Sequence, residues 1–109
     1  MLPAHKIKYI AEASTSLRDA LVLIDENKRR SIIIVSADRV VGTLSDGDAR
    51  RALLDGHLME TPVASLMNTN FVFVRVGEER VAVDIFAAGH VFLVPVVDDE
   101  NRLVDVLEK

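Results

Sequence analysis

The segment GTLSDGDARRAL, Gly42 to Leu53, carries the side chains of this sequence that are best suited to binding a ligand. Ser45 and Asp48 lie three residues apart in it, where an apolar segment ends and a helical one begins. The unpaired N–H groups and the positive dipole end at a helix start attract an anion. A serine hydroxyl there can donate to a phosphate oxygen, and a carboxylate can accept from both hydroxyls of a ribose. The pair is therefore a candidate nucleotide site.

The spacing of Ser45 and Asp48 has a second interpretation that involves no ligand. The two residues match a capping box in which aspartate replaces glutamate, and capping alone would explain both residue types. The sequence leaves the two interpretations open. Arg50 and Arg51 follow in the same helix and point about 100° apart, so at most one of them faces a pocket. A solvated helix face, a dimer contact and a phosphate contact are all open for them, with Arg51 as the phosphate candidate.

Other chemistries lack part of their residue set. Asp46-Gly47-Asp48 after a strand has the D-x-D pattern of aspartyl-phosphate phosphatases, but this short, repetitive chain does not suit that fold. An EF-hand fails because its third ligand and its final glutamate are absent. His5 and His57 are isolated, and the sequence has no zinc-ligand spacing, catalytic triad or G-x-G-x-x-G motif. We therefore expect no catalytic residue, no metal and no required cofactor in a chain that is not itself an enzyme.

The composition sets the class of protein. Hydrophobic residues make up 50% of the 109 residues and aromatic residues only 5%, so Val, Ile, Leu and Ala must build the core. The net charge of −4 disfavours a nucleic-acid surface. Apolar stretches such as 91–97 are too short to span a membrane, and Lys6 and Lys8 do not open a signal peptide. Because the chain also has no cysteine, we expect a cytoplasmic protein.

Hydrophobic periodicity and turn residues divide the chain into helices and strands. A helix begins after the cap candidates Ser14–Ser16 and carries cations in its last turn. The β-branched run SIIIVS predicts a buried strand, which the turn at 37–39 pairs with the next one. The predicted elements are a helix from residue 17, strands 31–36 and 40–45, a helix over 46–54, a helical turn over 60–67, a strand over 71–76, a helix over 78–90, and strands 91–97 and 102–107.

The two halves of the chain superimpose at an offset of about sixty residues, which indicates an internal repeat. Ile33–Val35 lies over Pro95–Val97, for example. One β-α-β-β-α unit of this kind cannot bury its sheet alone. We therefore predict an α/β (α+β) fold in which two repeats, residues 1–58 and 59–109, pack sheet against sheet with pseudo-twofold symmetry. The second repeat is truncated at its C-terminal end.

The repeat resembles the CBS domain, and two in tandem resemble a Bateman module. The first copy carries the family ending, G-h-h-[ST]-x-x-D, as Gly42-Thr43-Leu44-Ser45-Asp46-Gly47-Asp48. The second carries the hairpin as Val94-Pro95-Val96-Val97-Asp98, but has Asp105 in place of the glycine and Glu108 in place of the serine or threonine. It stops at Lys109, before the terminal aspartate and the last helix. The resemblance covers nearly the whole chain.

The resemblance assigns roles to residues around the pair. It implies that Ser45 holds a phosphate and Asp48 a ribose. Because pseudo-twofold packing sets the end of one repeat beside the start of the other, we expect two segments to complete the pocket: residues 68–70, and residues 91–95, whose backbone can hydrogen-bond an adenine edge. His90 is a candidate phosphate neighbour, although a histidine that complements the dipole of a helix C-terminus is the more common alternative. The site that mirrors this one is expected to be empty, because Glu108 would repel a phosphate. The candidate ligand-binding residues are Thr43, Ser45, Asp48, Asn68, Asn70, His90, Phe92, Leu93 and Pro95, and the phosphate candidates are Ser45, Arg51 and His90.

The expected function is regulatory. The segment SDGDARRALLDG is similar to CBS pairs attached to sugar-phosphate enzymes. In sugar-nucleotidyltransferases the pair is N-terminal to the enzyme, and in arabinose-5-phosphate isomerases it is C-terminal. The start at Met1 and the ending PVVDDENRLVDVL favour the former, with a catalytic domain following. We expect the pair to bind an adenine, guanine or sugar nucleotide, above all AMP, ADP or ATP, to modulate that enzyme and to form homodimers. The alternative is an architectural dimerisation module without a small-molecule ligand. Neither nucleic acid nor a membrane is an expected partner.

Overall fold

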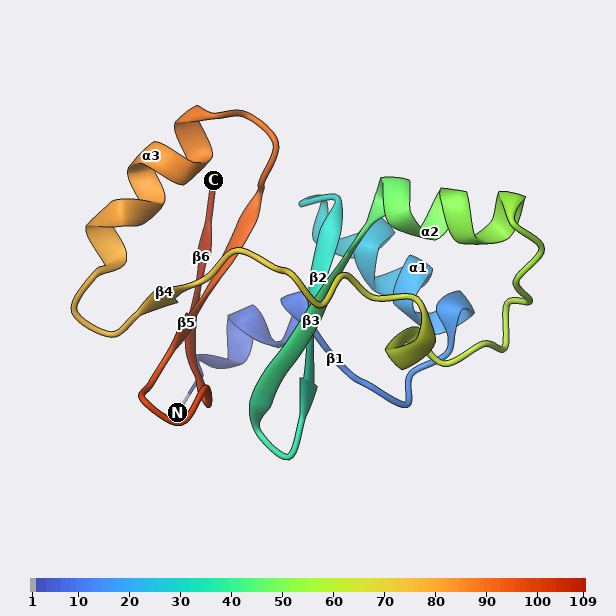
Figure 1. The fold of residues 1–109 in the computed structure, drawn as a ribbon, viewed down its shortest axis with the longest axis horizontal. Coiled ribbons are helices and arrows are strands. Elements are labelled where there is room, and N and C mark those ends of the chain that lie inside the picture. The colour runs from blue at the N-terminus through green and yellow to red at the C-terminus, as the bar shows by residue number, and fades with distance from the viewer. Residues whose placement is uncertain (1) are drawn as a thin grey trace.

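The computed structural model describes residues 2–109, which form two three-stranded sheets flanked by helices (Figure 1). The predicted mixed fold of two repeats, β1 to α2 and β4 to β6, is confirmed. None of the helices formed by residues 2–109 combines the length and the apolar character needed to cross a lipid bilayer. In chain order the elements are the 3₁₀ helix η1 (Ala4–Tyr9), β1 (Ile10–Glu12), α1 (Leu17–Asn27), β2 (Ser31–Ser36), β3 (Arg39–Ser45), α2 (Asp46–Leu54), the 3₁₀ helix η2 (Val63–Ser65), β4 (Val74–Arg75), the 3₁₀ helix η3 (Glu79–Val81), α3 (Ala82–Ala87), β5 (Leu93–Val97) and β6 (Leu103–Glu108).

Both sheets have the same topology and register. In each sheet the first two strands are parallel and the last two are antiparallel. Each antiparallel pair has its irregularity at the same place, between Ile34 and Val35 in the first sheet and between Val96 and Val97 in the second. The internal repeat is therefore present in the hydrogen-bond register as well as in the order of elements.

Backbone hydrogen bonds join the hairpin of each sheet to the hairpin of the other sheet. The Val40 N–H donates to the Asn101 carbonyl at 3.0 Å, and the Leu103 N–H donates to the Asp38 carbonyl at 2.9 Å. Val40 and Leu103 occupy equivalent positions. Each pairs with the residue of the central strand that directly follows the irregularity, Val35 in the first sheet and Val97 in the second. Each bond is thus the counterpart of the other under a twofold rotation, as pseudo-twofold packing requires.

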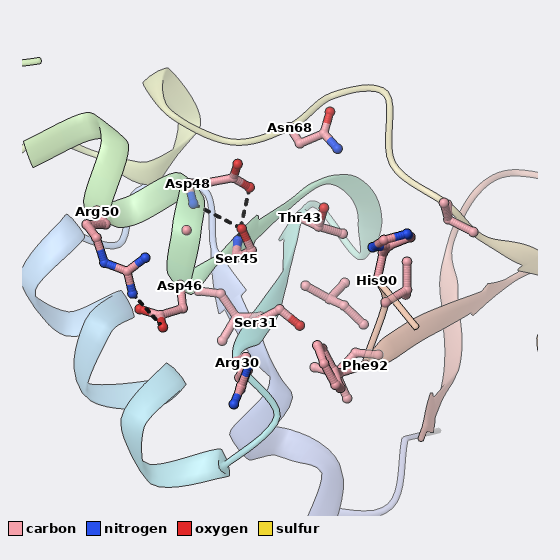
Figure 2. Close-up of a pocket in the computed structure, with 16 residues that line it drawn as sticks. Arg30, Ser31, Thr43, Ser45, Asp46, Asp48, Arg50, Asn68, His90 and Phe92 are labelled. Carbon is pink, nitrogen blue, oxygen red and sulfur yellow. Dashed lines mark hydrogen bonds and ion pairs between the residues drawn. The ribbon is translucent and has the colours of Figure 1, made fainter. Parts of the chain in front are cut away.

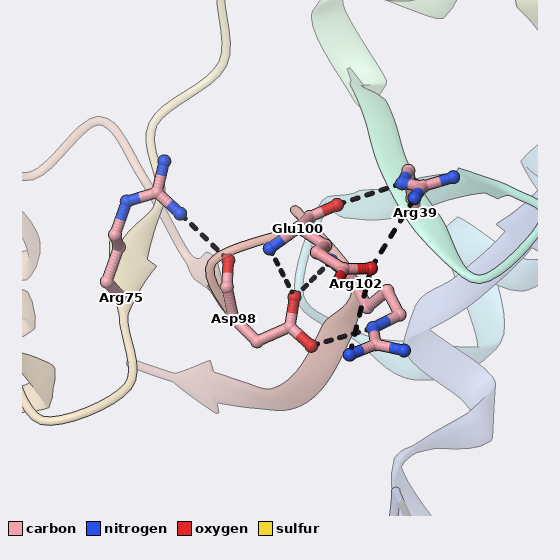
Figure 3. Close-up of polar contacts among 5 residues, drawn as sticks. All are labelled: Arg39, Arg75, Asp98, Glu100 and Arg102. Atoms are coloured by element: carbon pink, nitrogen blue, oxygen red, sulfur yellow. Dashed lines mark hydrogen bonds and ion pairs between the residues drawn. The ribbon is translucent and has the colours of Figure 1, made fainter.

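Charged side chains reinforce the junction of the hairpins (Figure 3). The Nε of Arg39 donates to the Glu100 carbonyl at 2.9 Å, which ties the first repeat to the second. Within the second hairpin, Asp98 Oδ1 accepts from the N–H groups of Glu100 and Arg102, both at 2.9 Å, and Oδ2 accepts from Arg102 Nε at 2.8 Å. The hydrogen bond from the Arg102 N–H is the main cause of a lowered pKa of Asp98.

The central strands are buried on both faces, as their continuous apolar runs predict. Successive side chains of a strand point to opposite faces, so β2 contributes to two cores. Ile32 and Ile34 pack beneath α1 with Leu17, Ala20 and Leu44. Ile33 and Val35 instead form the core between the sheets, together with Tyr9, Val40, Leu93, Val97 and Val106.

Asn27 is a buried polar side chain that fixes the turn from α1 to β2, with only 4% of its surface exposed. Its Nδ2 donates to the carbonyls of Lys8 at 3.2 Å and Ser31 at 2.9 Å, and its Oδ1 accepts from the Arg29 N–H at 2.8 Å. The turn from α1 to β2 contains two non-glycine residues with a left-handed backbone, Lys28 at φ 59° and Arg30 at φ 62°.

Several predicted element boundaries were wrong. The strand expected over 71–76 shortens to β4, because residues 71–73 belong to the segment that crosses from one sheet to the other (Figure 1). The helix expected over 78–90 is reduced to η3 and α3, and Gly89, with φ 86°, ends it. The helical turn expected over 60–67 is only η2. The three-residue strand β1 is too short to leave a pattern in the sequence.

Candidate functional site

Ser45 closes β3 and caps α2. Its Oγ accepts from the Asp48 N–H at 3.0 Å, and Asp48 Oδ2 accepts from the Ser45 N–H at 3.1 Å, which completes a capping box. The structural interpretation of the pair is therefore confirmed. Both side chains can still bind a ligand. The cap uses the Ser45 hydroxyl only as an acceptor, so its O–H can still donate a hydrogen bond. Asp48 uses its second oxygen to accept from Arg51 at 3.1 Å, and each carboxylate oxygen can accept a further hydrogen bond.

Ser45 and Asp48 line a cleft of about 500 Å³ between the two repeats (Figure 2). That volume lies within the range of about 300–1,000 Å³ that small-molecule sites occupy. One wall comes from the start of β2, the end of β3 and the first turn of α2, and the other from the segment that enters β5. The cleft is lined by Arg30, Ser31, Ile32, Ile33, Thr43, Ser45, Asp46, Gly47, Asp48, Arg50, Asn68, Val72, His90, Val91, Phe92 and Leu93.

Most of the residues expected at the site line this one cleft. They come from three separate segments, which the pseudo-twofold packing brings together as expected. In Figure 2 Thr43, Asn68 and His90 surround the cleft together with Ser45 and Phe92. The expected residues that line it are Thr43, Ser45, Asp48, Asn68, His90, Phe92 and Leu93.

Three expected residues do not line the cleft. The Asn70 N–H donates to Asn68 Oδ1 at 3.0 Å, and this turn leads the exposed Asn70 out of the cleft. Pro95 lies two residues further along β5 and is fully buried. Arg51 is an exposed side chain held against Asp48, so it is Arg50 of the adjacent pair that lines the cleft.

Arg30 is the most significant residue that sequence reasoning missed. Its carbonyl accepts from the Asp46 N–H at 2.8 Å, just as the carbonyl of Phe92 accepts from the Lys109 N–H at 3.0 Å. Arg30 and Phe92 are therefore equivalent positions in the two repeats. Their side chains meet in the cleft, with the guanidinium carbon 5.6 Å from the ring centroid. The repeat offset, applied to Phe92, was the signal that could have identified Arg30.

The linker between α2 and β4, residues 55–73, is fixed against β3 at the edge of the cleft. Thr43 and Asn68 exchange two backbone hydrogen bonds, at 3.1 and 2.8 Å. This approach requires Gly42, because a Cβ on that residue would lie 2.6 Å from Met67 Sδ and 3.0 Å from Met67 Cβ. The glycine of the motif is thus a packing requirement that allows Asn68 to reach the cleft.

The electrostatics of the cleft favour an anionic ligand. The two acidic side chains in the first turn of α2 are each paired with an arginine of the same helix, at 3.0 and 3.1 Å. Arg30 forms no ion pair within residues 2–109. Its guanidinium lies on the Phe92 ring, and the Lys109 ammonium lies 5.3 Å from the centroid of the same ring. Positive charge beside an aromatic ring suits a phosphorylated ligand with a planar base.

The equivalent position in the second repeat is occupied by ion pairs. Glu108 pairs with Leu93 in the β ladder as Ser45 pairs with Ser31, so it takes the place of Ser45. Its carboxylate lies 2.7 Å from the Arg29 guanidinium, and this hydrogen bond lowers the pKa of Glu108. Asp105, in the place of Gly42, is likewise 2.7 Å from the ammonium of Lys6.

Comparisons with known proteins give the family of the chain. Residues 4–55 match the family model of the CBS domain. Over these residues the chain belongs to the CBS domain family. It is 34% identical over 103 residues to an uncharacterized protein of Helicobacter pylori strain 26695, and 26% identical over 96 residues to the arabinose 5-phosphate isomerase GutQ of Salmonella typhi. Each alignment covers 86% of this chain and 30% of the relative, so this CBS chain spans about 30% of the length of these curated relatives.

Solved CBS proteins share the fold along almost the whole chain. The CBS-pair protein CBSX2 of Arabidopsis thaliana has a TM-score of 0.75 at 24% identity, covering 99% of this chain and 84% of that one. A structure of CBSX2 in complex with AMP gives the same TM-score of 0.75. The CBS domain protein PAE2072 of Pyrobaculum aerophilum, also in complex with AMP, has a TM-score of 0.72 at 19% identity, covering 91% of this chain and 78% of that one. The fold is therefore that of a CBS pair.

Proposed function

We propose that the chain is a regulatory module that senses a nucleotide, of the adenosine type, bound in the cleft between its two CBS repeats. The observation that carries the proposal is the convergence of a serine hydroxyl, a carboxylate and a cation without an ion-pair partner around one cleft. These groups are Ser45, Asp48 and Arg30. The AMP complexes of CBS proteins with the same fold support the choice of ligand.

Each part of a nucleotide has a chemically matched partner in the cleft. The Ser45 hydroxyl and the first turn of α2 suit the phosphate, and Arg30 supplies the opposite charge. Asp48 suits the ribose hydroxyls, because a carboxylate accepts two hydrogen bonds from a vicinal diol. His90 lies across the cleft from them and is a second phosphate candidate. Phe92 and its apolar neighbours suit the base.

The regulated activity belongs to an attached enzyme that acts on a sugar phosphate or transfers a nucleotidyl group. The likeness to GutQ, an arabinose 5-phosphate isomerase, supports the first of these classes. A nucleotide that binds one arrangement of the two repeats better than another shifts their equilibrium, and the attached domain responds to that shift.

The proposal is tested by thermal unfolding of the chain with AMP, ADP, ATP, GTP and CMP. A ligand at a hundred times its dissociation constant adds about 2.7 kcal/mol, which raises the Tm of a domain of this size by roughly 10 °C or more. Ser45→Ala removes both the cap and the ligand hydroxyl. Ser16→Ala is the matched control, because Ser16 caps α1 in the same way, accepting from the Asp19 N–H at 3.1 Å, but does not line the cleft. Each variant loses about 1 kcal/mol of stability, and only Ser45→Ala loses the response to ligand.

A specific observation favours a second function, homodimerisation without a small-molecule ligand. Leu54 and Leu58 lie at and just beyond the end of α2, with 81% and 70% of their surface exposed. Exposed apolar side chains of this size on neighbouring positions mark contact surfaces. Sedimentation of Leu54→Glu beside the unchanged chain tests whether α2 holds a dimer. No Tm change with any nucleotide, together with a dimer that Leu54→Glu dissociates, would select the architectural function over the sensing one.

A further inference from the structure

A second cavity, of about 460 Å³, adjoins the nucleotide cleft. The two cavities share Arg30 and Asp46 as lining residues, so these side chains form a common wall. The remaining lining of the second cavity consists of Leu21, Ile24 and Asp25 of α1 and of Lys28, which follows the helix. Ile24 and Asp25 lie three and four residues after Leu21, which places these three positions on one side of the helix.

The two cations of the second cavity stand on an unfavourable backbone. Lys28 and Arg30 have left-handed φ angles, in which a Cβ crowds the following carbonyl. Neither Lys28 nor Arg30 forms an ion pair within residues 2–109. Two cations thus stand at left-handed positions that glycine would adopt more easily, and both line the second cavity.

Resting on the proposed function, we propose that the ligand is a nucleoside diphosphate joined to a sugar, whose nucleoside lies in the cleft and whose sugar lies in the second cavity. The diphosphate crosses the common wall beside Arg30 and Lys28. The sugar meets Asp25, whose carboxylate accepts from hydroxyl groups, and the apolar side chains of Leu21 and Ile24 face its C–H groups.

The charges of the second cavity do not favour a further phosphate. Two carboxylates, Asp25 and Asp46, line it together with two cations, Lys28 and Arg30, so a terminal phosphate there would meet no net positive charge. A second base is disfavoured for another reason, because the cavity has no aromatic side chain in its lining on which a base could stack. A hexose needs neither and gains hydrogen bonds from the carboxylates.

The experiment is calorimetric titration of the chain with AMP, ADP and ADP-glucose. We expect ADP to bind about tenfold more tightly than AMP, and ADP-glucose about tenfold more tightly than ADP, as one or two added hydrogen bonds to a charged group allow. Asp25→Asn should weaken ADP-glucose about tenfold and leave AMP within twofold. Glu26→Gln is the matched control, because Glu26 is exposed on the same helix outside both cavities.

Lys28→Gly tests the diphosphate separately without a folding risk, because glycine adopts the left-handed φ of 59° freely. It should weaken ADP and ADP-glucose about tenfold and AMP hardly at all. Equal affinity for the three ligands, or an ADP-glucose affinity that Asp25→Asn does not change, overturns the inference and leaves the proposed nucleotide site standing. Failure of all three to bind overturns both.

Discussion

Replacing Gly42 by alanine tests the contact that fixes the linker against β3. The added Cβ would lie 2.6 Å from Sδ, 2.7 Å from Cγ and 3.0 Å from Cβ of Met67. The Sδ atom can swing aside, but the Cβ cannot move unless the backbone of the linker moves with it. Overpacking of this kind costs about 1–3 kcal/mol. For a domain of this size that corresponds to a Tm lower by roughly 5–20 °C.

The same substitution at Gly47 is a control with the opposite sign. A Cβ on Gly47, in the first turn of α2, meets only Ser45 Oγ, at an ordinary 3.8 Å. Since alanine favours a helix over glycine by about 1 kcal/mol, Gly47→Ala should raise the Tm. Both variants are followed by thermal and urea unfolding. Gly42→Ala as stable as the unchanged chain would refute the assignment of this glycine to packing.

Three further predictions concern polar groups. Because Arg29 lowers the pKa of Glu108 below its usual 4.5, this pair stabilises the fold above that pH and its contribution is lost as the pH falls through the lowered value. Arg29→Met should therefore flatten the acid side of a stability–pH curve by less than about 1 kcal/mol, since both side chains are partly exposed. Asp98→Ala should lower the urea midpoint, because the N–H groups of Glu100 and Arg102 lose the carboxylate oxygen to which they donate. Asp98→Asn should keep part of that stability, because its amide oxygen can still accept. Asn27→Ala should cost about 3 kcal/mol in urea unfolding, because three hydrogen bonds of a buried side chain are lost.

The first repeat could be predicted closely because its signals are local. Ser16 caps α1, the run SIIIVS is buried on both faces as β2, and Ser45 closes β3 and opens α2 where the sequence places them. The second repeat was predicted less well because its elements have weaker local signals. The N-cap of α3 is Val81, which makes no capping hydrogen bond, and β4 has two residues whose strand character comes only from pairing with β5.

The candidate site divides along the same line. Ser45 and Asp48 follow from a contiguous motif, and the segment before β5 follows from the repeat. Arg30 depends on a contact across the pseudo-twofold axis, which no local pattern reports. The choice between the two adjacent arginines of α2 depends on the rotation of that helix, which is set when it packs against α1 and β3. Distant packing therefore decides what the motif alone leaves open.

The pseudo-twofold fold offers two equivalent positions for an anion, and the charges make them unequal. In the first, Ser45 is neutral and leaves Arg30 without a carboxylate partner within residues 2–109. In the second, Glu108 brings its own negative charge and takes Arg29 as its partner at 2.7 Å. Arg29 and Arg30 are consecutive residues of one turn. Arg30 lies at the first position, where it is available to an anion, and Arg29 lies at the second, where it is paired with Glu108. A bound anion at the second position would have to displace a carboxylate already held by that guanidinium, whereas at the first it meets an unused one. One ligand per chain is the stoichiometry that this asymmetry predicts, and calorimetric titration measures it directly.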